Sequence, residues 1–238
     1  MARFRGGRGL RTGQWEVVVG AAENLLGGEM MSLLPAALRH CLTEPTWWED
    51  ELQGLHVVQA LTALALPTAC DGYRLVDNPP SPRWDWQGHA LVHESSLLHT
   101  GVNLFGPVLI GPDCEIGPNA SIFGPTVIEG RSYLGPSVEI RRCLLLAGAE
   151  VSHMSFLGHS VIGRRAAVGA FFCSAVRNLR RGTVHVIRDG MLADTGERRL
   201  GCVIADDVET TVRTTVMPGR RITKTPATSP NSLIMKNC

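Results

Sequence analysis

Long hydrophobic runs, a strong net charge and paired cysteine motifs are all missing from this chain of 238 residues. Lys and Arg total 23 against 22 for Asp and Glu, so the net charge of +1 gives no electrostatic reason to expect a nucleic acid or an anionic membrane as partner. No apolar stretch reaches the roughly 18 residues of a membrane span, and no hydrophobic segment follows the N-terminal arginines. The seven cysteines form no CxxC pair, which favours reduced thiols and a cytoplasmic location.

A period of six residues dominates the middle of the chain, and it fits neither an α-helix nor a pleated strand. The apolar positions of this repeat are Val92, Leu98, Leu104, Ile110, Ile116, Ile122, Ile128, Leu134, Ile140 and Leu146. Such hexads are typical of a parallel β-helix, in which the branched residue points inward and three hexads complete one triangular coil. Successive coils then stack roughly 4.8 Å apart, as hydrogen-bonded strands do. We therefore predict a mainly β fold.

The first 87 residues lack the hexads and are predicted to form an arm followed by a helical cap and linker. Arginine and glycine dominate the start of the chain, as in a loosely packed arm. Apolar spacing typical of helices follows over 29–41 and 47–66. The segment 77–86, rich in Pro and Trp, would link to the first coil or cover it, since an open coil end exposes strand edges.

The β-helix itself is predicted over residues 88–222. After Leu146 the spacing drops from six to five, and a slip of one residue bulges a strand and redirects its side chains. Over about 173–203 the hexads vanish, which predicts a loop extruded from the coil and closed as a hairpin near Gly190. The polar residues 223–238 are expected to be a flexible tail.

Four segments stand out along the repeat: IGPDCEIGPNASI from Ile110, SVEIRRC from Ser137, SHMSFLGHSVIG from Ser152, and LADTGERRLGCVIADDVETTVRTTVMPG from Leu192. The His-x-x-aromatic-x-Gly element that begins at His153, just before the loop, is much more specific than the hexads. Over about 88–222 the chain resembles the C-terminal acetyltransferase domain of the bifunctional N-acetylglucosamine-1-phosphate uridyltransferase/glucosamine-1-phosphate acetyltransferase, and archaeal sugar-1-phosphate nucleotidylyltransferases built like it. The resemblance implies a left-handed β-helix, an exception to the usual right-handed crossover. It also implies a homotrimer that binds acetyl-CoA between subunits. Apolar pairs at 144–145 and 171–172 would supply faces for the trimer to cover.

By this resemblance His153 matches a catalytic histidine that takes a proton from the acceptor amine as the amine attacks the thioester. An imidazole suits this task because it titrates near neutral pH. The alternative is that His153 only satisfies a backbone carbonyl. Arg141 matches a lysine that contacts the acceptor, although an arginine at a coil corner is often simply solvated.

Further residues are candidates for binding the acyl donor, which is acetyl-CoA, another acyl-CoA or an acyl carrier protein. Backbone N–H groups of Gly169 and Ala170 would polarise the thioester carbonyl. Arg177, Arg180 and Arg220 could meet the phosphates of CoA, with a solvated basic loop as the alternative.

The acceptor site departs from the family at four positions. Phe123 stands in place of an arginine used on the sugar phosphate, and Phe156 in place of a tyrosine. Ala167 and Val176 align with two asparagines, although an offset of two would bring Asn178 to the second place. A site that has lost hydrogen-bonding partners discriminates strongly against its former polar ligand. Either the acceptor is less polar than glucosamine 1-phosphate, or the site no longer catalyses.

Two further classes of function find little support. No glycine-rich nucleotide-binding signature precedes residue 88, so the uridylyl-transfer half is not expected. His153 and His159 lie six residues apart, on successive faces of one coil, so no metal site is expected.

The leading hypothesis is an acyl-CoA-dependent N-acyltransferase that acts on an amino sugar or an amine of specialised metabolism. The alternative is a catalytically inactive trimeric scaffold or regulatory protein.

Overall fold

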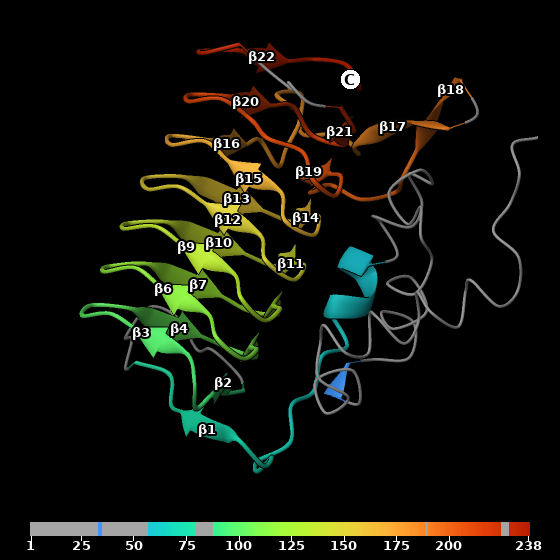
Figure 1. Cartoon of the computed structure of the whole chain (residues 1–238). Helices are drawn as coiled ribbons and strands as arrows, with labels where there is room; N and C mark the ends of the chain where they lie inside the picture. The colour runs from blue at the N-terminus through green and yellow to red at the C-terminus, as the bar shows by residue number, and fades with distance from the viewer. Residues whose placement is uncertain (1–32, 35–56, 80–87, 189, 225–228) are drawn as a thin grey trace, which may run out of the picture.

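The computed structural model describes residues 33–34, 57–79, 88–188, 190–224 and 229–238. Within these residues the chain forms a parallel β-helix, built as three sheets that run along the three sides of a prism (Figure 1). The chain climbs from the first sheet to the second, then to the third and back to the first, and winds in the left-handed sense (Figure 1). The predicted fold class is confirmed.

The strands of each sheet come from successive coils. The first sheet contains, in spatial order, β1 (Tyr73–Val76), β2 (Ala90–His93), β5 (Val108–Ile110), β8 (Thr126–Ile128), β11 (Leu144–Leu145), β14 (Val161–Ile162), β19 (Cys202–Ile204) and β21 (Arg220–Ile222). The second contains β3 (Leu97–Leu98), β6 (Glu115–Ile116), β9 (Tyr133–Leu134), β12 (Glu150–Val151) and β15 (Ala167–Val168). The third contains β4 (Asn103–Phe105), β7 (Ser121–Phe123), β10 (Glu139–Arg141), β13 (Phe156–Gly158), β16 (Cys173–Ser174), β20 (Thr215–Val216) and β22 (Leu233–Ile234). All these pairings are parallel except that of β1 with β2.

The pairing register shows where the repeat holds and where it slips. Ala90 pairs with Val108 and Val108 with Thr126, so each of these coils contains three full hexads. Leu145 pairs with both Ile128 and Ile162, so each of the next two coils is shorter by a single residue. The slip therefore lies before Leu145, whereas the spacing of the hexads predicts it after Leu146. Leu146 belongs to the outer apolar cluster, because the shorter coil turns Leu145 inward in its place.

The interior of the prism is a stack of branched apolar side chains. Ile116, Ile122, Ile128 and Ile140 are all fully buried and belong to one cluster that runs through the coils. Three thiols share this interior, and burial raises the pKa of Cys114 to about 11 and those of Cys143 and Cys202 to about 12. These cysteines act as small apolar residues that remain protonated at neutral pH.

The outer face of the first sheet is also apolar, and the N-terminal segment covers it (Figure 1). Residues 57–61 are helical, and Val57 and Leu61 are fully buried against this face. The sheet contributes the buried residues Leu91, Leu109, Val127, Leu144 and Val161. The rest of the two predicted helices lies mostly outside the described residues, as does the arm 1–28.

The proposed trimer faces need correction. Leu144 and Leu145 are fully buried within the chain, one under the N-terminal segment and the other in the interior. Phe172 is buried as well, and only Phe171 is exposed, at 41%. These positions therefore leave one apolar side chain, not four, for a partner subunit.

The segment between β16 and β19 leaves the coil and forms an antiparallel hairpin of β17 (His185–Arg188) and β18 (Met191–Asp194). Val184, Val186 and Leu200 at the base of the hairpin pack against Val58 of the N-terminal segment. The hairpin does not disturb the stacking of the coils, because Val161 before the hairpin pairs with Val203 after it. The loop and the N-terminal segment thus meet beside the first sheet.

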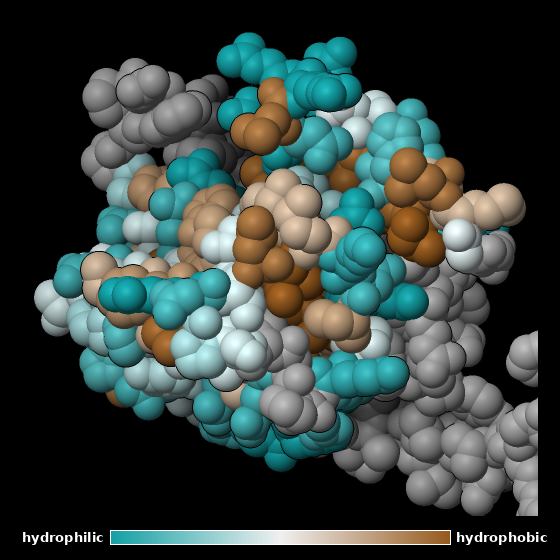
Figure 2. Space-filling model, turned by 90° about the horizontal axis from the view of Figure 1, so that it is seen from above, coloured by the Kyte–Doolittle hydropathy of each residue, from teal (hydrophilic) through white to brown (hydrophobic). Residues whose placement is uncertain are grey.

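The C-terminal residues do not form the flexible tail that their polar composition suggests. β22 pairs with β20, so Leu233 and Ile234 add a further partial coil beyond Ile222. Residues 225–228 lie outside the described part of the chain. Figure 2 looks down on this end, where apolar groups lie in separate patches between hydrophilic ones. Leu233 and Met235 are each more than half exposed, so the last described coil leaves apolar side chains uncovered.

Candidate active site

His153 lies on the corner between β12 and β13, with its side chain exposed. Its ring meets the ring of Phe171 edge to face, with 5.6 Å between the centroids. The backbone is held firmly: the carbonyl of His153 accepts a hydrogen bond from the N–H of Phe171 at 3.1 Å. A Cβ on Gly135 in the coil below would lie 2.6 Å from the nitrogen of His153, so that glycine allows the close approach. No group in the described part of the chain forms a hydrogen bond with the His153 ring, which is therefore available to a ligand.

Arg141 lies on the outer face of the third sheet, above a stack of two aromatic rings. Phe105, Phe123 and Arg141 are in register on three neighbouring strands. The two rings are parallel with centroids 4.6 Å apart, and the guanidinium carbon of Arg141 lies 3.9 Å from the centroid of Phe123. Arg141 Nε also donates to Glu139. This column holds a cation on an aromatic platform, a favourable arrangement when partly shielded from water.

Phe105 was missed by the sequence reasoning, although a signal existed. It precedes Phe123 by three hexads, which make one full coil, and the pairing of β4 with β7 brings the two rings together. A search for aromatic residues at the coil spacing, and not at the hexad spacing, would have identified it.

The structure brings Phe156 and Val176 close together, and their role in one acceptor pocket stays a prediction. A Cβ on Gly158 would lie 2.6 Å from Cγ1 of Val176 and 3.1 Å from Cζ of Phe156, so both side chains cover that glycine. Gly158 in turn pairs with Arg141. Four of the predicted acceptor residues, Phe123, Arg141, Phe156 and Val176, therefore share one side of the prism.

Ala167 does not join them. It lies on β15 of the second sheet, where it pairs with Glu150 and forms a bridge with Glu209. The corner that carries His153 separates its sheet from the third sheet. Within one chain, Ala167 therefore cannot line the same pocket as Arg141 and Phe123.

The predicted role of Gly169 in polarising a thioester is wrong for this chain. Its N–H already donates to Thr210 Oγ1 at 3.1 Å, and a Cβ at this position would lie 2.5 Å from the carbonyl carbon of Thr211. Gly169 is a glycine because the next coil passes close to it. Ala170, whose carbonyl accepts the N–H of Arg213 at 2.8 Å, stays a prediction.

The predicted phosphate contacts fall into two groups. Arg177 and Arg180 are exposed in the segment after β16. Arg220 is partly buried and donates from Nη2 to the carbonyl of His185 at 2.9 Å, so it fastens the hairpin to the coil. Arg220 is thus a structural residue in this state of the chain, and the other two stay predictions.

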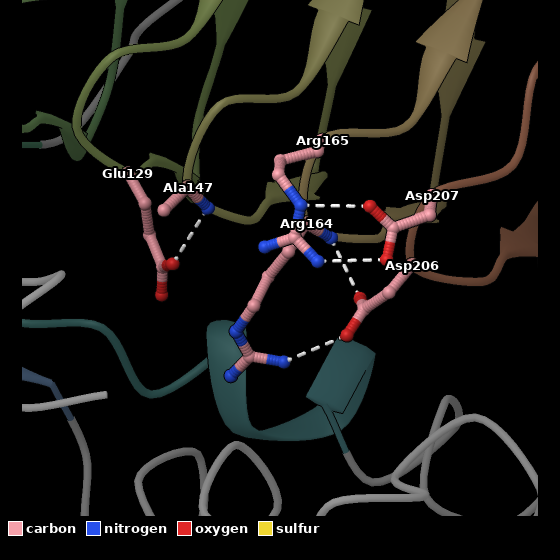
Figure 3. A network of polar contacts seen from close by, with 6 residues as sticks. All are labelled: Glu129, Ala147, Arg164, Arg165, Asp206 and Asp207. Carbon is pink, nitrogen blue, oxygen red and sulfur yellow. Dashed lines mark hydrogen bonds and ion pairs between the residues drawn. The ribbon is translucent and has the colours of Figure 1, made fainter. Parts of the chain in front are cut away.

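A polar network occupies the corner between the first and second sheets (Figure 3). Arg164 pairs with Asp206 at 3.2 Å, and Arg165 pairs with Asp207 at 2.7 Å. Glu129 points toward the same corner and is fully buried, and its Oε2 accepts the N–H of Ala147 at 2.9 Å. Burial raises the pKa of Glu129 to about 8, against the opposing attraction of Arg164. This carboxyl group is therefore mostly protonated at neutral pH.

Two other properties bear on function. Among the residues that the structure describes, no group of three His, Cys, Asp or Glu side chains is placed to hold a metal ion. In the same residues no helix combines the length and the apolar character that a membrane crossing needs.

Comparisons with known proteins agree with the predicted resemblance. Over 136 residues the chain is 28% identical to a bifunctional sugar-1-phosphate nucleotidylyltransferase/acetyltransferase of Sulfurisphaera tokodaii, a match that covers 57% of this chain and 34% of the relative. Over 85 residues it is 33% identical to the bifunctional protein GlmU of Nitratidesulfovibrio vulgaris, with coverages of 36% and 18%. The chain thus matches about a third or less of the length of these relatives.

A solved structure also matches. It is that of the Arabidopsis UDP-N-acetylglucosamine acyltransferase, with 21% identity and a TM-score of 0.32, over 54% of this chain and 41% of that one. A protein-family model also matches: the family described as the GMPPB C-terminal domain matches residues 104–232, which is more than half of the chain and includes His153, Arg141 and the hairpin. This chain therefore belongs to the family of the GMPPB C-terminal domain.

Proposed function

We propose that this chain is an acyl-CoA-dependent N-acyltransferase that acts on an amine less polar than glucosamine 1-phosphate, such as an amino sugar without that phosphate or an amine of specialised metabolism. The observation that carries the proposal is the placement of His153. Its ring is exposed, it has no hydrogen-bonding partner among the described residues, and it lies on a rigid corner next to Phe171. A general base needs such freedom to reach a proton on a bound substrate.

The reaction is a direct transfer. The amine nitrogen attacks the thioester carbonyl carbon, the new C–N bond forms, and the C–S bond breaks to release the CoA thiol. His153 takes the proton that the nitrogen loses and, as the imidazolium, returns it to the departing thiolate, so the CoA thiol is released and the histidine is neutral again. No covalent intermediate with the protein is needed, because holding the two substrates together supplies much of the rate.

The acceptor surface supports a change of substrate. Phe105, Phe123 and Phe156 give the outer face of the third sheet an aromatic character, and the guanidinium of Arg141 lies over the ring of Phe123. An aromatic platform with one cation suits an acceptor with an apolar or planar part, whereas it offers few hydrogen bonds to a phosphate.

The proposal includes a homotrimer with the site shared between subunits, and a CoA thioester or an acyl carrier protein as donor. The relative from Sulfurisphaera tokodaii carries acetyltransferase in its name, which supports the reaction class. In the described part of the chain Cys114, Cys143, Cys173 and Cys202 are free thiols, which supports a reducing compartment such as the cytoplasm.

The test is release of CoA thiol from acetyl-CoA and longer acyl-CoAs across a panel of amines, with product mass measured for each. We expect His153→Ala to reduce the rate about 10²–10⁴-fold with little change in CoA affinity. His99→Ala is the matched control, since His99 is a partly exposed histidine of the first coil that pairs with Glu115. If no amine is acylated and His153→Ala changes nothing, the chain is an inactive scaffold. Rapid turnover of glucosamine 1-phosphate would contradict the changed acceptor.

A further inference from the structure

A small pocket of about 220 Å³ lies where the corner between the third and first sheets meets the base of the hairpin. Arg142 and His159 of the coil line one side, and Glu197, Arg198 and Arg199 line another. The N-terminal segment closes the pocket with uncharged side chains between residues 58 and 62. Three parts of the chain that are distant in sequence thus surround one space.

The stacking of the coils places Arg142, His159 and Arg199 in three successive coils. His159 donates its backbone N–H to the carbonyl of Arg141 at 2.8 Å, and its own carbonyl accepts the N–H of Gly201 at 2.9 Å. Arg142 and His159 both adopt left-handed backbone angles, with φ of 52° and 50°, so they occupy the same corner position in neighbouring coils. Arg199 lies in the next coil, just before Gly201. The imidazole of His159 therefore lies near the guanidinium groups of the coil before it and the coil after it.

The charges in this pocket are not balanced. Three guanidinium groups face one carboxylate, which leaves two positive charges when His159 is neutral. In the described part of the chain the salt bridges of arginine are formed by Arg141, Arg164 and Arg165, none of which lines this pocket. Nε of Arg142 is buried and has no hydrogen-bonding partner there. A buried donor without a partner costs stability, which a bound acceptor would restore.

The protonation state of His159 reflects the same excess of positive charge. Burial, with Arg142 and Arg199 acting in the same direction, lowers the pKa of His159 to about 4. The imidazole is therefore neutral at neutral pH, and it can donate one hydrogen bond without adding to the positive charge.

We propose that this pocket binds a phosphate group of a small-molecule ligand, with Arg142 and Arg199 as its main contacts. A phosphate dianion matches the excess of two positive charges, and arginine forms paired hydrogen bonds with its oxygens. A carboxylate would leave one charge unbalanced. The pocket is smaller than the sites that enclose drug-sized ligands, so it suits a phosphate or diphosphate group whose attached part lies outside.

The inference goes beyond the proposed acyl transfer and does not depend on it. His153 lies on the corner between the second and third sheets, whereas Arg142 and His159 lie on the corner between the third and first. A ligand phosphate could come from CoA, from a nucleotide or sugar phosphate, or from free phosphate. The probes below distinguish these sources.

The experiment is calorimetric titration of the full chain with inorganic phosphate, inorganic pyrophosphate, GDP and CoA at constant ionic strength. We expect at least one probe to bind with a Kd below about 1 mM, and Arg142→Gln or Arg199→Gln to weaken that binding about 10-fold or more. Arg74→Gln is the matched control, because it removes the same charge from an exposed position on β1. The probe that binds most tightly identifies the source of the phosphate.

A second measurement separates binding from folding. NMR titration of the His159 imidazole should show its pKa rising when the probe binds, because the anion offsets the charges of the three arginines. Glu197 is the carboxylate among the residues that line the pocket, and repeating the titration in Glu197→Gln removes its charge from this readout. The proposal is overturned if no probe binds, if Arg74→Gln weakens binding as much as Arg142→Gln and Arg199→Gln do, or if the imidazole pKa does not respond to a saturating probe. Loss of acyl transfer alone would leave it standing.

Discussion

Glu129 makes the stability of this protein depend on pH, and one substitution tests the reason. The carboxyl group is fully buried and accepts one hydrogen bond, from the N–H of Ala147. Its other oxygen has no partner among the described residues, and the nearby guanidinium of Arg164 is engaged by Asp206. Burial therefore outweighs attraction, and the pKa of Glu129 is raised from 4.5 to about 8.

The sign of the effect follows from proton linkage. Between pH 4.5 and 8 the folded chain keeps the Glu129 proton, whereas the unfolded chain releases it. The free energy of unfolding must then fall as pH rises through this window. A shift of this size corresponds to about 3–5 kcal/mol between the two ends of the window.

Glu129→Gln isolates this contribution because glutamine has nearly the same shape and does not titrate. The amide has its own hydrogen-bonding cost, but that cost is the same at every pH. We compare the unfolding free energy of the variant with that of the unmutated chain. We expect this difference to shift in favour of the variant by about 3–5 kcal/mol as the pH rises from 4.5 to 8.5. Urea unfolding at several pH values measures it, with the exposed Glu150→Gln on β12 as the control. An effect that stays constant across this range would refute the buried, protonated carboxyl group.

Three further predictions concern the core, the N-terminal segment and the assembly. Ile128→Ala should reduce the unfolding free energy by about 2–5 kcal/mol in urea titrations, because Ile128 is fully buried between coils, and a loss below about 0.5 kcal/mol would contradict its inward position. Leu61→Ala should cost a similar amount and should also speed proteolysis before residue 73, since Leu61 packs the helical segment onto the first sheet. Light scattering at micromolar concentration should report a trimer, and a monomer there would remove the shared active site.

The order of the coils was predictable because a hexad is a local pattern. Ile116, Ile122, Ile128, Leu134 and Ile140 all point inward as the spacing of six predicts, and their strands pair one coil apart. The corners were predictable for the same reason, since each hexad repeats one conformation. The hairpin could be expected from the loss of hexads and from a turn sequence near Gly190.

The exact register at the slip could not be predicted in this way. Leu144, Leu145 and Leu146 have the same side chain, so their sequence contains no preference for which one points inward. Pairing of Leu145 with Ile128 below and Ile162 above decides it, and its two neighbours then pack beneath the N-terminal segment. The C-terminal partial coil shows the same limit, because Leu233 and Ile234 pair with β20 despite their polar surroundings.

The sequence by itself determined the coil, its period and the corner on which His153 lies, because these depend on residues close together along the chain. Only the tertiary structure decided which side chains share a surface. Stacking of successive coils joins Phe105 to Phe123 and Arg141, and it moves Ala167 to another side of the prism. The meeting of Arg142, His159 and Arg199 also needs the hairpin to return beside the coil and the N-terminal segment to cover the first sheet. Contacts of this kind depend on packing between distant segments, for which the order of residues along one segment carries no signal.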